Sequence, residues 1–283
     1  MGVAELSNER TKMRFYLAIF SMFPSITNLL PGNPLFVAYG VIVALGAGFV
    51  RGFAGFGFSA FTVAGLSLLF SPDRIVPASM LLEVFASLSL LRSVWQDISW
   101  LWLKPLIFGN AIAVPLGVWS LAIIPSAPLQ ALVSGVILCA SGLLLSDIRL
   151  PWSDTPQLRF ATGLLSGFFN GLSAVGGMIV AVMLFSTLLS PKTSRATLIS
   201  FFFMSYVYAL CWAQGQGLID TTMFEWVLCL VSSMLVGIAL GQRHFFKVSE
   251  MQFRRIVLQI LAVISTLGLA RSFFKWQGSF ISF

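Results

Sequence analysis

Long apolar runs dominate the chain from residue 35 onward, and short polar or Pro/Gly-rich gaps separate them. The runs are continuous rather than alternating, and several approach the roughly 17–25 residues that a helix needs to cross a hydrocarbon core. This pattern predicts an all-α, polytopic membrane protein. The expected helical segments are 35–50, 54–70, 75–92, 105–124, 129–146, 158–169, 174–189, 196–213, 223–241 and 255–274.

These segments fall into two sets of five that resemble each other at an offset of 119 residues. Between Leu45 and Pro72, ten of the 28 residues are identical to the residue 119 positions further along, and no gap is needed. Internal duplication is common in transporters. The matches include glycines 48, 52 and 57 with glycines 167, 171 and 176, and Ser71-Pro72 with Ser190-Pro191.

The first two segments of each set are short and separated by glycines, which is the best sequence pointer to a transporter's binding site. They either cross the membrane or enter it and turn back as a hairpin. Each set then makes either five crossings, or three crossings and one re-entrant hairpin, and in both cases the chain ends on the side of the membrane opposite to where it began. The second set should therefore lie upside down relative to the first. The expected fold is therefore two inverted repeats of about five helical segments each, with short Gly-interrupted helices near the membrane centre.

Charge is scarce, and its location predicts the orientation. Only 10% of the residues are charged and the mean hydropathy is +0.93, so the excess of 17 Lys and Arg over 10 Asp and Glu does not indicate nucleic-acid binding. Ten basic residues fall in the third, fifth, seventh and ninth gaps, whereas the gaps on the other side hold only Arg74. By the positive-inside rule the ten-charge face is cytoplasmic. Arg10, Lys12 and Arg14 place the N-terminus there too, and an inner cell membrane location is expected.

The expected organisation has five parts. Residues 1–34 form an extra crossing or an interfacial helix, 35–146 the first repeat, 147–157 a cytoplasmic linker, 158–275 the second repeat and 276–283 a C-terminal tail. Trp95, Trp100 and Trp102 predict an interfacial belt. Lys192 and Arg195, beside the second Ser-Pro turn, are expected to mark the membrane interface as well.

The stretch GFVRGFAGFGFSAF, from Gly48 to Phe61, places an arginine among glycines in an apolar run. An ionisable residue within the membrane is a functional candidate by default. An arginine supplies charge and a donor fork for an oxyanion, helix N-termini supply N–H groups, and glycines let an anion approach the backbone. The predicted anion-binding residues are Arg51, Gly55, Gly57, Ser59, Asn170, Ser173, Gly176 and Gly177.

The glycines and Arg51 can also be explained by structural roles instead of anion binding. Glycines also permit close helix packing, and Arg51 could form an ion pair or snorkel to an interface. Glu83 is the other charged residue inside an apolar segment. It is a candidate for proton coupling, and a static Arg51–Glu83 bridge is an equal alternative.

Two motifs carry a family resemblance. GFAGFGFS near the start of the first set and GLSAVGGM in the second, each followed by a Ser-Pro turn, resemble the TauE/SafE sulfite exporters, also called toluene sulfonate uptake permeases. The resemblance covers about residues 36–274. It implies transport of sulfite, sulfoacetate or other organosulfonates and leaves the direction open. The first motif departs from the G-x-G-G-G type of the family, and Arg51 is not implied by the resemblance.

Other function classes fit less well. An intramembrane serine protease needs a histidine base, and the only histidine is His244, in the charged ninth gap. No H-E-x-x-H motif or carboxylate pair suggests metal hydrolysis. The sequence therefore predicts a permease rather than an enzyme, with no cofactor and no metal site, whose partners are a small anion and the lipid bilayer. An anion channel, or a transporter of another small organic anion, remains the alternative.

Overall fold

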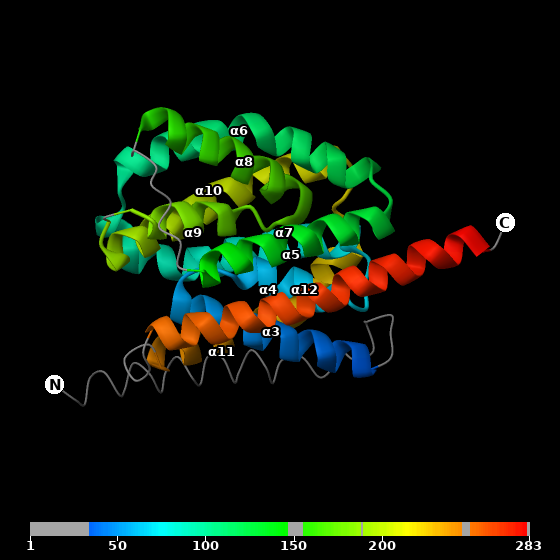
Figure 1. The fold of residues 1–283 in the computed structure, drawn as a ribbon. Coiled ribbons are helices and arrows are strands. Elements are labelled where there is room, and N and C mark those ends of the chain that lie inside the picture. The colour runs from blue at the N-terminus through cyan, green and yellow to red at the C-terminus, as the bar shows by residue number, and fades with distance from the viewer. Residues whose placement is uncertain (1–33, 147–154, 188, 245–249, 282–283) are drawn as a thin grey trace.

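The computed structural model describes residues 34–146, 155–187, 189–244 and 250–281, which form a bundle of helices without strands (Figure 1). The first five helices are α3 (Pro34–Ala54), α4 (Phe58–Leu66), α5 (Pro72–Val94), α6 (Trp100–Ile123) and α7 (Ser126–Leu145), with a short 3₁₀ helix, η1 (Trp95–Asp97), before α6. The next five are α8 (Pro156–Ser173), α9 (Gly177–Phe185), α10 (Pro191–Gly215), α11 (Thr221–His244) and α12 (Glu250–Ile281). The expected segment at 1–34, apart from Pro34, and most of the linker lie outside the described residues.

The helices agree with the expected segments in number and order, and the two interrupted regions differ in detail. The chain stays helical through the expected gap at 51–53, and α3 ends only at Ala54. In the second set α8 continues to Ser173. The interruptions therefore fall at residues 55–57 and 174–176, which are 119 positions apart.

Helices long and apolar enough to cross a membrane account for most of the described chain. There are six in this part: 35–54, 72–97, 100–123, 126–145, 191–215 and 223–243. By contrast, α4 and α9 have nine residues each, or about 14 Å of helix, which is less than half of a hydrocarbon core. Neither short helix can cross a membrane alone.

Each short helix folds back along the helix before it. The Tyr39 hydroxyl, near the start of α3, donates to the Gly65 carbonyl near the end of α4 at 2.8 Å. The rings of Phe36 and Phe70 lie 5.9 Å apart, so the chain has returned by Phe70 to the level at which α3 began. In the second set, Leu158 at the start of α8 and Met183 near the end of α9 line the same groove.

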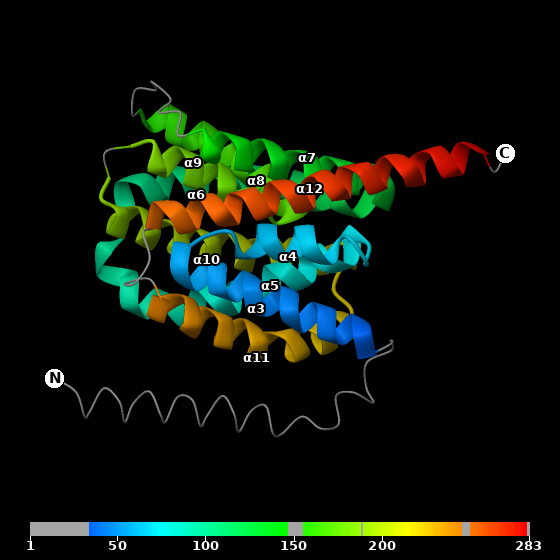
Figure 2. The same ribbon diagram turned by 60° about the horizontal axis from the view of Figure 1, so that its bottom comes forward.

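Glycines bring two helix pairs into backbone contact, α3 with α11 and α6 with α8, and each pair lies side by side in both views (Figures 1 and 2). A Cβ added to Gly52 would lie 2.2 Å from the Ile238 carbonyl oxygen, and one added to Gly117 would lie 2.1 Å from that of Phe168. Close packing thus explains many of the glycines, as expected when small residues let membrane helices approach.

The packing has a regular pattern across the two sets. In chain order, α3 to α7 of the first set correspond to α8 to α12 of the second. The contact of α3 with α11 therefore has its counterpart in the contact of α8 with α6. The α5–α10 and α7–α12 pairs map onto themselves, and both pairs are in contact. Of these helices, α5 contacts α4 and α8, and α10 contacts α8 and α9, so both lie beside the interrupted hairpins.

Candidate functional site

The first interruption is a short non-helical turn between α3 and α4. Gly55 and Gly57 have positive φ angles of 78° and 87°, a backbone region that residues with a Cβ rarely adopt. Phe56 lies between them with its side chain buried. The two glycines are therefore required by the turn, whether or not a ligand approaches them.

Arg51 lies in the last turn of α3 and is fully buried, with 0% of its side chain exposed. Its Nη2 lies 2.9 Å from Glu83 Oε1 and donates to Ser87 Oγ at 2.8 Å. Its Nη1 donates to the Gly55 carbonyl, and the Phe202 ring of α10 lies 4.5 Å from its Cζ. The ion pair that the sequence left as one alternative is present, and snorkelling to an interface is excluded by the burial.

Glu83, on α5, is 1% exposed and meets the start of α4. Its Oε2 accepts from the Ser59 hydroxyl at 2.6 Å and from the Ser59 N–H at 3.2 Å. Ser59 is the second residue of α4, so this N–H is one of the donors that a helix N-terminus leaves unsatisfied. A carboxylate thus occupies a helix N-terminus, where negative charge is favoured.

The second interruption is held by neutral groups. Asn170 Oδ1 accepts from the Gly177 N–H at 3.0 Å, and its Nδ2 donates to Ser205 Oγ at 2.9 Å. The Tyr206 hydroxyl, on α10, lies 2.6 Å from the Ala174 carbonyl oxygen and 3.1 Å from Asn170 Oδ1. Asn170 stands 119 residues after Arg51, so an uncharged amide holds one hairpin where a guanidinium holds the other.

The two interruptions meet at a small cavity. Its lining residues come from both turns, from the starts of α4 and α9, and from α10: Gly57, Ser59, Ala60, Ala174, Val175, Gly177, Met178, Phe202 and Tyr206. Its volume is about 10 Å³ for the centre of a water molecule, which is room for roughly one water. Sulfite or a sulfonate does not fit this space without movement, so the described conformation is closed around the candidate site.

The predicted site residues therefore divide into three groups. Gly57, Ser59 and Gly177 line the cavity, and Arg51 and Asn170 contact residues that line it. Gly55 and Gly176 are not among its lining residues. A Cβ on Gly176 would lie 1.9 Å from the Ser166 carbonyl oxygen, which indicates packing.

Ser173 is buried but does not point a free donor at the cavity. Its hydroxyl donates to the Phe169 carbonyl in its own helix at 2.8 Å. Two aromatic residues that line the cavity, Phe202 and Tyr206, were not among the predicted site residues. The offset of 119 could have found them, because they correspond to Glu83 and Ser87, and each pair is spaced by four residues on its helix.

Arg195 and Trp102 also differ from expectation. Arg195 Nη2 donates to the Gly52 carbonyl near the end of α3 at 2.8 Å, and its Cγ would lie 2.6 Å from a Cβ added to Gly55 in the first interruption. Trp102 is 2% exposed and lies under Arg159, whose Cζ is 4.6 Å from its ring, so it does not belong to a surface belt. Trp95 and Trp100 are exposed, and Lys192 is exposed and pairs with Asp97 at 3.0 Å.

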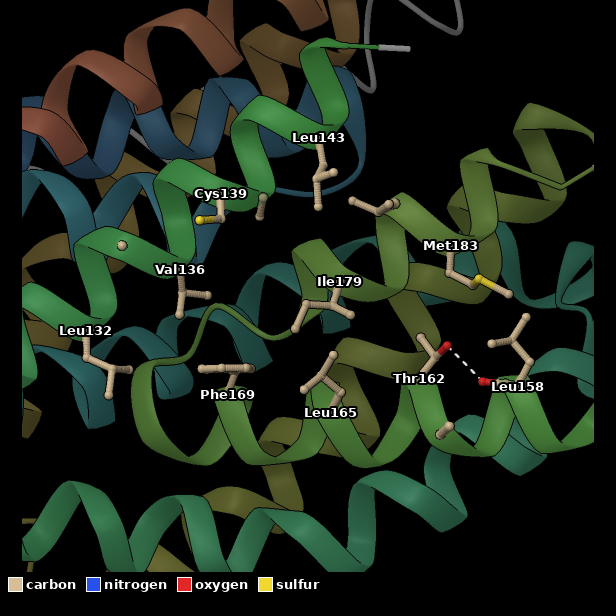
Figure 3. Close-up of a pocket in the computed structure, with 14 residues that line it drawn as sticks. Leu132, Val136, Cys139, Leu143, Leu158, Thr162, Leu165, Phe169, Ile179 and Met183 are labelled. Carbon is tan, nitrogen blue, oxygen red and sulfur yellow. Dashed lines mark hydrogen bonds between the residues drawn. The ribbon is translucent and has the colours of Figure 1, made fainter. Parts of the chain in front are cut away.

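A separate groove of about 640 Å³ lies between α7, α8 and α9. Figure 3 shows aliphatic and aromatic side chains pointing into it, including Leu132, Leu165 and Phe169. The hydroxyl of Thr162, which lines it, already donates to the Leu158 carbonyl at 2.8 Å. This groove offers apolar surface rather than donors for an oxyanion.

Comparison with known proteins gives one match. A protein-family model described as "Sulfite exporter TauE/SafE" matches residues 40–267. Neither a curated protein nor a solved structure matches the chain. The matched range includes both interruptions and every residue of the cavity. In the described part of the chain, no cluster of three or more His, Cys, Asp or Glu side chains is arranged to hold a metal ion.

Proposed function

Because the chain belongs to the sulfite exporter TauE/SafE family, we propose that it is a secondary active permease for small sulfur-containing oxyanions such as sulfite or organosulfonates. The observation that carries this proposal is the buried guanidinium of Arg51 beside a cavity that both interrupted hairpins line. Charge-assisted donors in a dry setting suit an oxyanion. The family membership supports the substrate class, and the site supports the position of the substrate.

A carrier fits the site better than a channel does. A channel needs a continuous wet path in its open state, whereas the cavity between the interruptions holds about one water. A carrier encloses its substrate between movements of its two halves. The interrupted hairpins, which the long helices surround, are the elements expected to move.

We further propose that the two halves are inverted repeats, related by a two-fold axis in the membrane plane. The support is the element order, since each half has one hairpin followed by three long helices. A hairpin returns the chain to its starting side and three crossings do not, so successive halves enter from opposite sides. The exchange of the α3–α11 and α8–α6 pairs agrees with such an axis.

The orientation follows from charge. Under this topology the start of α10 with Lys192 and the start of α6 with Lys104 lie on the cytoplasmic side of the inner membrane, as the positive-inside rule requires. The first hairpin then opens from the outside and the second from the cytoplasm. The N-terminus is cytoplasmic if residues 1–34 contribute one crossing.

Uptake into proteoliposomes tests the function. We expect saturable uptake of sulfite and of methanesulfonate by the wild-type protein. Arg51→Gln keeps donors but removes the charge, and it should weaken binding by roughly tenfold to a hundredfold, the loss of one charge-assisted hydrogen bond. Arg92→Gln is the matched control, because Arg92 is exposed at the end of α5. Wild-type transport by Arg51→Gln would contradict the assignment of the site, and non-saturable flux would indicate a channel.

A further inference from the structure

The carboxylate of Glu83 binds the donors that the proposed function assigns to a substrate anion. Its Oε2 accepts from the Ser59 hydroxyl and N–H, and its Oε1 lies 2.9 Å from Arg51 Nη2. These are the donors expected for a bound oxyanion: one hydroxyl, one N–H of a helix start and one guanidinium. Ser59 also lines the cavity, so the residue that binds the carboxylate is in contact with the free space as well.

The donor set is not fully used by Glu83. The Nε of the buried Arg51 has no hydrogen-bond partner in the described part of the chain. Glu83 Oε1 accepts no hydrogen bond of suitable geometry there either, so Arg51 holds this oxygen mainly by charge. A carboxylate has two oxygens, whereas a sulfonate has three, and a third oxygen offers an acceptor for the unused donor.

Arg51 and Glu83 pair one to one. The phenol of Tyr206 and the ring of Phe202 face the pair from α10. Arg195 is a further cation nearby, and its Nη2 donates to the carbonyl of Gly52, the residue after Arg51. The sequences of α4 and α7 hold no charged residue. Elsewhere, Arg159 of α8 donates to the Leu101 carbonyl, η1 carries Asp97, and the charges of α11 stand near its two ends.

We propose that Glu83 is an internal occupant of the anion site, and that a monovalent oxyanion takes its place on Arg51 and Ser59 when Glu83 accepts a proton. The inference rests on the proposed function and narrows its substrate class. Before the exchange, Arg51 faces one carboxylate. Afterwards it faces one monoanion beside a neutral carboxylic acid, so the net charge of the site does not change.

The substrate class follows from that balance. A sulfonate or bisulfite carries one negative charge and leaves the site neutral. A dianion such as sulfate adds an uncompensated charge in a buried place, which is strongly unfavourable. The site therefore selects monoanions, and one proton enters with each anion.

Methanesulfonate is the best probe, because its charge stays the same across the working pH range. Because one proton enters with each anion, binding to the purified wild-type protein, measured by calorimetry, should tighten by about tenfold for each unit by which the pH is lowered. Titrations in buffers of different ionisation enthalpy should show the uptake of one proton per anion. Sulfate should not compete.

Glu83→Gln removes the internal charge and should bind methanesulfonate with the same affinity at every pH. Glu225→Gln is the matched control, since Glu225 lies near the start of α11, away from the site, and it should keep the wild-type pH dependence. If Glu83→Gln fails to fold, proton uptake by the wild-type protein still decides the question. Binding of methanesulfonate without proton uptake would overturn the inference and show that Glu83 only caps α4.

The two proposals fail in different ways. If the wild-type protein binds neither sulfite nor methanesulfonate, the proposed function is wrong and this inference falls with it. If the protein binds methanesulfonate with a pH-independent affinity, the function survives and the inference does not. Equal binding of sulfate and methanesulfonate would contradict the selection of monoanions.

Discussion

The backbone contact between α3 and α11 makes a strong test of the packing. Gly237, in the middle of α11, faces α3 so closely that an added Cβ would lie 2.2 Å from the Leu45 carbonyl oxygen and 2.9 Å from the Phe49 nitrogen. Both neighbours are backbone atoms, which cannot turn away as a side chain does. Gly237→Ala therefore requires the two helices to separate.

The size of the effect can be worked from these distances. Ordinary contact begins at 3.4 Å, so the helices must move apart by about 1 Å. Overpacking of this kind costs about 1–3 kcal/mol, while alanine in place of a helical glycine returns up to about 1 kcal/mol. With the middle of the first range and the full gain, we expect a net loss of about 1 kcal/mol, which corresponds to a decrease of roughly 2–4 °C in Tm.

Thermal unfolding in one detergent, followed by tryptophan fluorescence, measures the change. Gly135→Ala is the matched control, because Gly135 lies in the middle of α7 and an added Cβ there has nothing within 4 Å. Its Tm should be unchanged or slightly raised. Equal Tm values for the two variants would refute the close approach of α3 and α11.

Two further predictions concern the site and the orientation. Gly177→Val places a Cβ 1.7 Å from a Phe202 ring carbon, so the ring must leave its position over Arg51, and methanesulfonate affinity should decrease at least about tenfold. Gly215→Val is the control, because a Cβ there has nothing within 4 Å. Unchanged binding by Gly177→Val would show that the cavity is not part of the binding site. In a cysteine-free background, a cysteine at position 192 should react with an impermeant maleimide only from the cytoplasmic side and one at 216 only from outside, and the opposite result would reverse the topology.

The hydrophobic pattern predicted the helices well because membrane helices are defined by composition and length. It misplaced the interruptions because glycine has two roles here. Gly52 packs against Ile238 inside a continuous helix, whereas Gly55 and Gly57 make the turn. The two roles differ in whether α11 packs against the glycine, and the local sequence pattern does not show where α11 lies.

The charged residues of the candidate site could be singled out from the sequence, whereas its aromatic residues could be reached only through the offset of 119. Arg51 and Glu83 stood out because charge is rare in apolar segments. Phe202 and Tyr206 are ordinary residues in such a segment, and they matter only because α10 packs against α5. Similarly, the local sequence around Arg195 did not show that this residue of α10 reaches the Gly52 carbonyl of α3.

The neutrality of the Arg51–Glu83 pair has a consequence for the membrane potential. Moving one elementary charge through 100 mV changes its energy by about 2.3 kcal/mol, so a carrier with a lone buried arginine would be pulled towards the negative side of the membrane. A paired arginine and glutamate that move together transfer no net charge across the field. A site built in this way can change its exposure from one side to the other at a rate that membrane voltage does not set.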